Sequence, residues 1–346
     1  MNSRMLCLFI CLMSLLSCEH RPLVEQDIIP HTRHIRVYLD EHIRNVSFGF
    51  YDETKDKPVY KTPQVLRVTL SDPHTERVKT EAYLTHAGKD EQGNYLEGKI
   101  TALPGTYHLM VYNFDTESVH IANEYNYAKM YAYTNLVSED VRNRLVCMRN
   151  VLDDDWKIVY DPDHFFIAAQ EMVEVSENTD TLKTESGTHF TATTSVKTYY
   201  LQIQVEGASY ITSASALLSG LAGSITIRNR ELDKNDPVAV YFDLNNGKDK
   251  GRQEKSVAYA TFNTFGKLED EENLLKVTFE FYTRDGRTVT ETIPLTDLFS
   301  TDMVRVNQWI IIDKAIVIDP PEEGESAEGI TPNVGEWENT EAEIFI

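Results

Sequence analysis

The sequence predicts an all-β protein, built as two tandem antiparallel β-sandwich domains with little helix. Segments in which apolar and polar residues alternate recur along the chain, and turn residues separate them. No strand–helix–strand rhythm interrupts this pattern. The length of 346 residues also suggests about two domains, at roughly 100–200 residues per domain.

Composition and charge narrow the classes of function. The chain carries 55 acidic and 33 basic residues and a formal net charge of −22. This excess argues against nucleic-acid binding, which needs a basic face, and against adsorption to anionic headgroups by charge alone. The four cysteines are Cys7, Cys11, Cys18 and Cys147, a spacing that fits neither a disulfide scaffold nor a zinc site. We therefore expect no metal and no cofactor.

The first residues have the form of an export signal. Arg4 precedes the apolar run Met5–Leu16, which is too short to span a membrane as a helix. The run ends at Ser17-Cys18, which resembles a bacterial lipobox. In such a site the peptidase cuts before the cysteine, whose sulfur carries diacylglycerol and whose amine is then acylated. We expect residues 1–17 to be a signal peptide and residues 18–33 to be a polar tether. The alternative is an ordinary secretory signal that contains a chance cysteine.

The expected N-terminal domain covers residues 34–186. Its predicted strands lie at 35–39, 46–50, 65–70, 81–85, 95–100, 105–112, 165–169 and 172–175. Leu103-Pro104-Gly105 is a turn that leads into one of them. The stretch 115–163 is the least regular and contains the best short-helix candidate, Glu139–Met148.

The expected C-terminal domain covers residues 187–346, after a polar boundary at 177–187. Its predicted strands lie at 199–207, 238–244, 259–265, 274–282, 289–293 and 309–318. Asp285-Gly286 is the tip of a predicted hairpin. Gly220 and Gly223 lie in a segment of small residues, where turns or close backbone packing are favoured over phosphate binding.

An ordered set of motifs resembles one bacterial family. A strand ends at Val205-Glu206-Gly207, and a small-residue segment then ends in Leu218-Ser219-Gly220-Leu221-Ala222-Gly223-Ser224. Ala102–Tyr107 precedes a strand that ends Val111-Tyr112-Asn113-Phe114, and Gly335-Glu336-Trp337-Glu338 lies near the C-terminus. Together, over nearly the whole mature chain, these features resemble the fimbrillin-like lipoproteins of Bacteroidales, the accessory and anchoring subunits of the type V pilus superfamily.

The resemblance implies a fold and a function. It implies two transthyretin-like β-sandwiches, an outer-membrane anchor through acylated (palmitate-type) Cys18, and a cell-surface role in fimbria assembly with other fimbrial subunits as partners. It also implies that polymerising members lose an N-terminal segment to an arginine-specific protease. Arg21, Arg33, Arg36 and Arg44 all lie early in this chain. Cleavage at any of them would release the lipid tether, which favours the anchor or accessory role.

The C-terminal segment is a candidate subunit-contact strand. In Thr340–Ile346, residues Ala342, Ile344 and Ile346 would share one face of a strand. A strand lent to a partner satisfies both the backbone groups and the apolar groove of an open sheet edge. The favoured interpretation is a last strand of its own domain, but the acidic, Pro- and Gly-containing stretch 320–335 before it would also allow donation.

A tyrosine row is the candidate for glycan or host-ligand binding. Tyr125, Tyr127, Tyr131 and Tyr133 would line one face of a single strand, as a platform for sugar rings. Inward packing of the same aromatic residues is favoured over this alternative.

Signals for other chemistry are weak. Asp153–Asp155 with Asp161 and Asp163 match no calcium-loop spacing and favour a solvated acidic loop. Cys147 and His164 would be a nucleophile pair only if the fold joined them, and a buried structural cysteine is favoured. Nucleophile-elbow, zinc-protease and phosphate-loop motifs are absent from the sequence. We therefore expect a non-enzymatic protein.

Overall fold

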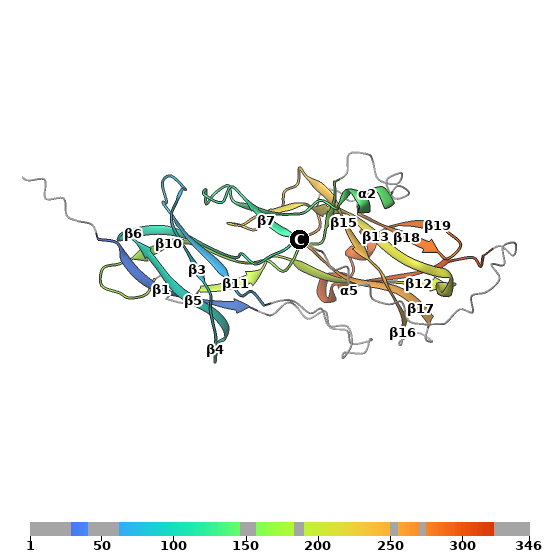
Figure 1. The fold of residues 1–346 in the computed structure, drawn as a ribbon, viewed down its shortest axis with the longest axis horizontal. Coiled ribbons are helices and arrows are strands. Elements are labelled where there is room, and N and C mark those ends of the chain that lie inside the picture. The colour runs from blue at the N-terminus through green and yellow to red at the C-terminus, as the bar shows by residue number, and fades with distance from the viewer. Residues whose placement is uncertain are drawn as a thin grey trace, which may run out of the picture.

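The computed structural model describes residues 29–40, 62–145, 157–182, 190–249, 255–269 and 275–321. These residues form an elongated molecule of two β lobes with only short helices (Figure 1). The predicted all-β fold with little helix is confirmed. Within the described part of the chain, no helix combines the length and the apolar character needed to cross a membrane.

The N-terminal lobe is one bent, eight-stranded sheet in the order β3-β2-β6-β10-β11-β1-β5-β4. The bend brings β3 to β5, where Thr80 Oγ1 donates a hydrogen bond to the Thr101 carbonyl at 2.9 Å. Alternate apolar residues such as Ile35, Val37 and Leu70 fill the interior. The strands are β1 (His31–Asp40), β2 (Leu66–Ser71), β3 (Val78–Leu84), β4 (His86–Asp90), β5 (Gly93–Ala102), β6 (Gly105–Asn113), β10 (Phe166–Val175) and β11 (Phe190–Thr194).

The C-terminal lobe is a sandwich of a four-stranded sheet, β16-β17-β12-β20, and a five-stranded sheet, β19-β18-β13-β15-β9. Its core is rich in aromatic residues, and the rings of Phe242 and Phe262 stack at 4.2 Å. The strands are β9 (Lys157–Tyr160), β12 (Lys197–Glu206), β13 (Ile211–Ala222), β15 (Pro237–Asp243), β16 (Asn245–Asp249), β17 (Lys255–Thr264), β18 (Lys276–Thr283), β19 (Thr288–Pro294) and β20 (Trp309–Val317). Short helices η1 (Ala208–Tyr210), α4 (Thr296–Phe299) and α5 (Asp302–Asn307) connect them.

The two lobes exchange segments at their junction. A three-stranded junction sheet joins β7 (Val119–Ala122) and β8 (Tyr131–Thr134) to β14 (Ser224–Thr226). In the other direction, β9 pairs in parallel with β15 of the C-terminal lobe. Strands from both sides of residue 187 therefore pair with each other, and the boundary that we place there remains a prediction.

A separate apolar cluster fills the junction. It brings Tyr112 and Phe165, on the side of the N-terminal lobe, against Ile225 and Phe265, which follow residue 187. All four side chains are buried. This shared core, together with the exchanged strands, connects the two lobes by more than a linker.

The local predictions differ in outcome. The Asp-Gly hairpin is confirmed, since β18 and β19 pair and Gly286 has the left-handed φ of 80° that this turn requires. The predicted helix begins as expected, because α2 (Glu139–Arg144) is capped by the hydroxyl of Ser138. The expected strand at 46–50 lies outside the described residues.

The small-residue segment is a central strand, β13, which pairs with both β15 and β18. Gly220 lies at an irregularity of this strand with a φ of 82°. A Cβ on Gly223 would lie 2.6 Å from Val238 Cγ1, so β15 approaches too closely for any side chain. Close packing therefore accounts for Gly223, and the left-handed backbone accounts for Gly220.

Candidate functional site

Among the residues that the structure describes, β1 is the candidate functional element nearest to the predicted tether. Two sets of predicted site residues lie outside the described part of the chain. They are the cleavage and lipidation residues, Ser17 and Cys18, and the residues of the candidate subunit-contact strand, Ala342, Ile344 and Ile346. Strand β1 begins at His31, so residues 31–33, which the sequence places in the tether, belong to the sheet.

Strand β1 has partners on both sides. It pairs antiparallel with β5 from His31 opposite Ala102 to Tyr38 opposite Tyr95. On its other edge it pairs in parallel with β11, from Val37 opposite Phe190. Earlier on that edge, the His34 backbone N donates to the Asp180 carbonyl at 2.8 Å. The strand is thus an interior member of the sheet and not an exposed edge.

Arg33 fixes the start of β1. Its side chain is buried, and the residue is only 5% exposed. Arg33 Nε donates to the Ser176 carbonyl at 3.1 Å, Nη2 donates to the same oxygen, and Nη1 donates to the Thr32 carbonyl at 3.0 Å. A protease that recognises an arginine side chain would have to extract this one from the fold.

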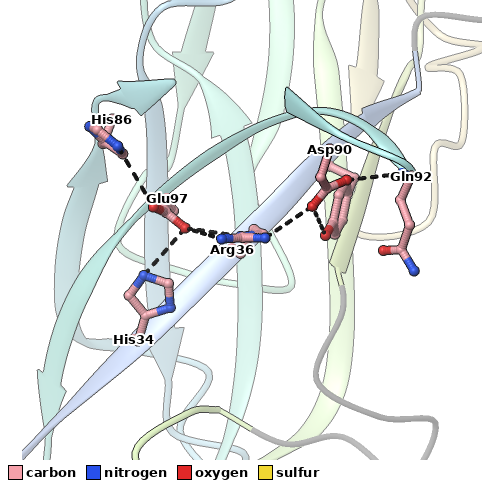
Figure 2. A network of polar contacts seen from close by, with 7 residues as sticks. His34, Arg36, His86, Asp90, Gln92 and Glu97 are labelled. Atoms are coloured by element: carbon pink, nitrogen blue, oxygen red, sulfur yellow. Dashed lines mark hydrogen bonds and ion pairs between the residues drawn. The ribbon is translucent and has the colours of Figure 1, made fainter. Parts of the chain in front are cut away.

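Arg36 is the centre of a polar network on the outer face of β1, β5 and β4 (Figure 2). Arg36 Nε donates to Glu97 Oε2 at 2.9 Å, and Nη1 donates to Asp90 Oδ2 at 3.0 Å. The guanidinium carbon also lies 3.8 Å from the centroid of the Tyr95 ring. The network joins three neighbouring strands at the residues that follow the tether.

Further polar groups complete the network. Tyr38 Oη donates to Asp90 Oδ2 at 2.9 Å. Partial desolvation opposes ionisation of Asp90, but hydrogen bonds from the Gln92 backbone and Tyr38, together with the charge of Arg36, lower its pKa. His34 Nε2 lies 3.5 Å from Glu97 Oε2 and His86 Nε2 lies 3.8 Å from Glu97 Oε1. Both imidazoles flank one carboxylate, as Figure 2 shows.

The four tyrosines do not share one face of a single strand. The predicted glycan platform of four residues is therefore wrong. Tyr125 and Tyr127 precede β8, and only Tyr131 and Tyr133 lie on it. Tyr127 is 1% exposed and stacks on His108 at 4.6 Å between ring centroids, and burial raises its pKa to about 12. Tyr131 and Tyr133 have ring centroids 5.9 Å apart, and Tyr125 is exposed. The residue numbers suggested one face, but a turn interrupts the strand.

The acidic residues near the junction have local structural roles. Asp163 Oδ2 accepts hydrogen bonds from the backbone N atoms of Glu117 and Ser118, each at 2.6 Å. Asp161 Oδ2 accepts one from the Asn263 backbone at 3.3 Å, and burial raises the pKa of Asp161 to about 6. Across the described ranges, no group of three or more His, Cys, Asp or Glu side chains is placed to hold a metal ion. Asp153–Asp155 and Cys147 lie outside those ranges.

A buried arginine that the sequence did not single out is fixed beneath the junction. Arg67 of β2 donates to Tyr112 Oη at 2.8 Å and forms ion pairs with Glu81 and Glu124. Desolvation lowers the pKa of Arg67, but its bonds with both carboxylates outweigh this and raise the pKa above its ordinary value. The alternating pattern of β2 predicted the strand, but not that its outward face would be covered.

Together, the fold and the site define a β-sheet protein of two lobes whose first strand is locked into the body. A family model described as "Domain of unknown function (DUF5119)" matches residues 17–243, about two thirds of the chain. The chain belongs to this family. The match begins one residue before Cys18 and extends through β15.

Two relatives add to this. A protein of Bacteroides ovatus (strain ATCC 8483) named "Putative fimbrium anchoring subunit Fim4B" is 23% identical over 189 residues, which are 54% of this chain and 49% of that protein. The match therefore spans about half the length of that relative. The crystal structure of a putative adhesin from Bacteroides ovatus ATCC 8483 is 18% identical, with a TM-score of 0.55, and the alignment covers 85% of this chain and 94% of that one. This likeness shows that the two proteins share a fold.

Proposed function

We propose that the protein is a lipid-anchored cell-surface subunit of a fimbria, with an anchoring or accessory role and no enzymatic activity. Acylated Cys18 would hold it in the outer membrane, and β-strand contacts would join it to other fimbrial subunits. The sequence resemblance and the relative named as an anchoring subunit support this role. The observation that carries the proposal is that β1, directly after the tether, is an interior strand.

The state of β1 distinguishes an anchor from a polymerising subunit. A subunit that loses its N-terminal segment must release a strand, whereas an anchor must keep it. Arg33 and Arg36 lie inside the paired strand, with their guanidinium groups bound to Ser176, Glu97 and Asp90. We infer that the mature protein keeps β1 and is not processed at these two arginines. Arg21 and Arg44 lie outside the described residues.

The decisive experiment is the mass and the N-terminal sequence of the mature protein isolated from its own host. We expect a chain that starts at acylated Cys18 and incorporates labelled palmitate. The Cys18→Ser variant should incorporate no label and should leave the membrane fraction. A mature chain that starts after Arg33 or Arg36 would contradict the anchoring role.

Partner binding has a separate test. Removal of Thr340–Ile346 should abolish co-purification with fibre subunits if these residues are a donated strand, whereas the N-terminal lobe should remain folded. A matched control replaces Glu341 and Glu343 by Gln, which keeps the apolar face of the segment. Normal assembly of the truncated protein would rule out donation.

A further inference from the structure

A break in the sheet of the N-terminal lobe leaves a cavity beside two arginines. Strands β10 and β11 pair only at Phe166 with Thr194 and at Ile167 with Thr193. Continuation of this register would pair Ala169 with Thr191. Instead, both residues line a cavity of about 240 Å³ that is also lined by Arg228, Asn229 and Arg230. These last three residues come from the segment between β14 and β15, so the cavity belongs to the lobe junction.

The two arginines differ in how their charge is balanced. Arg228 Nε donates to Glu171 Oε1 at 3.1 Å and forms an ion pair with the same carboxylate, so its charge is compensated. Arg230 Nη2 donates to the Ile167 carbonyl at 2.9 Å, and among the described residues Arg230 has no carboxylate partner. Within the described ranges, Arg230 is therefore a positive charge at the cavity wall with no carboxylate bound to it.

The backbone of Arg230 adopts a conformation that is unfavourable in free energy. Its backbone has a φ of 58°, in the left-handed region that non-glycine residues seldom adopt. The residue as a whole reaches solvent, but its guanidinium is partly enclosed where it contacts β10, and this desolvation lowers its pKa. The left-handed backbone closes the turn in which the Arg230 backbone N donates to the Thr226 carbonyl at 3.0 Å. The guanidinium, partly desolvated and without a described carboxylate beside it, can bind an anion through charge-assisted hydrogen bonds.

The remaining walls match a sugar ring better than a bare anion. Gln170, Thr191 and Asn229 supply amide and hydroxyl groups, and Ala168 and Ala169 leave room beside β10. The cavity volume of about 240 Å³ lies just below the roughly 300–1,000 Å³ of pockets that hold drug-sized ligands, so the cavity suits a small ring. A single uncompensated arginine corresponds to a single carboxylate, which it can bind through two parallel hydrogen bonds.

We propose that this cavity binds a carboxylated monosaccharide unit of a glycan, with Arg230 on the carboxylate and Gln170, Thr191 and Asn229 on the hydroxyls. The inference does not depend on the fimbrial role, because it rests on the junction cavity and not on β1. None of the four tyrosines lines this cavity, although Arg228 at its wall lies 5.4 Å from the centroid of the Tyr127 ring.

The test is a titration of the mature chain with three probes: glucuronic acid, glucose and acetate. Glucuronic acid should bind at least tenfold more tightly than either glucose, which lacks the carboxylate, or acetate, which lacks the ring. Equal binding of glucuronic acid and glucose would overturn the role of Arg230. Equal binding of glucuronic acid and acetate would overturn the saccharide assignment.

Variants locate the site. Arg230→Gln should weaken glucuronic acid binding by about tenfold or more and leave glucose binding unchanged. Because Arg230 also contacts backbone carbonyls, Thr191→Val provides a second, nearly isosteric change that should weaken the binding of both sugars. The matched control is Arg305→Gln on α5, whose arginine pairs with Asp302 and does not line the cavity. Unchanged affinity in a folded Arg230→Gln and in Thr191→Val would contradict the proposal.

Discussion

The two lobes achieve a closed β core by different means. The C-terminal lobe packs two sheets face to face around stacked rings, including Phe242 on Phe262 and Phe279 beside Phe281. The N-terminal lobe bends one sheet around a mainly aliphatic core and fastens β1 to its neighbours with Arg33 and Arg36. The C-terminal lobe thus relies on apolar packing, whereas the N-terminal lobe adds polar bonds along β1.

The largest expected effect comes from the aromatic core. Phe262→Ala should lower the free energy of unfolding of the C-terminal lobe by about 3–5 kcal/mol, because it removes a fully buried ring and leaves a cavity. Denaturant unfolding would measure the loss, and hydrogen exchange would show which lobe opens. Leu70→Ala is the matched change in the N-terminal lobe and should cost about 2–5 kcal/mol there. Equal acceleration of exchange in both lobes by either variant would show that they unfold as one unit.

The second effect concerns Asp161 near the lobe junction and the pH dependence of the free energy of unfolding. Burial raises the pKa of Asp161 to about 6 from an ordinary value of 3.8, so the folded state binds this proton more tightly than the unfolded state does. The favourable contribution of the protonated form is therefore present below pH 3.8 and is lost as the pH rises through about 6. Asp161→Asn should raise the free energy of unfolding at pH 7 by up to about 3 kcal/mol, and by much less at pH 3.5. The same gain at both values would show that the charge is not responsible.

The smallest expected effect on global stability concerns Arg36, whose network faces solvent. Arg36→Gln should barely change the midpoint of unfolding, since exposed ion pairs contribute little. It should nevertheless loosen β1 and so speed cleavage of the native protein at Arg33 by an arginine-specific protease. Mass spectrometry of the fragments over time would measure the cleavage rate. Arg305→Gln, which removes an exposed pair on α5, is the control. Cleavage at Arg33 that is equally fast in wild type and in Arg36→Gln would show that the network does not protect β1.

The sequence was most informative where a single strand or turn carries its own signal. Alternation in β1 and β12 and the Asp-Gly turn of β18–β19 were readable, because side-chain period and turn chemistry are local properties. The small-residue segment β13 was not recognised as a central strand, since strands buried on both faces do not alternate. The odd-numbered tyrosines led to a wrong prediction for a related reason. Residues two apart share a face only within an unbroken strand, and here a turn interrupts the strand.

By itself, the sequence determined the all-β class and the family resemblance, and it predicts an export signal before Cys18. Each of these depends on residues close together along the chain. Only the tertiary structure decided that β9 and β14 pair across the two lobes, that Arg67 and Tyr127 are buried, and that Arg230 faces a gap between β10 and β11. These features join residues far apart in the sequence. Long-range strand pairing is set by the packing of whole sheets, and the pattern of any one strand does not specify its partner.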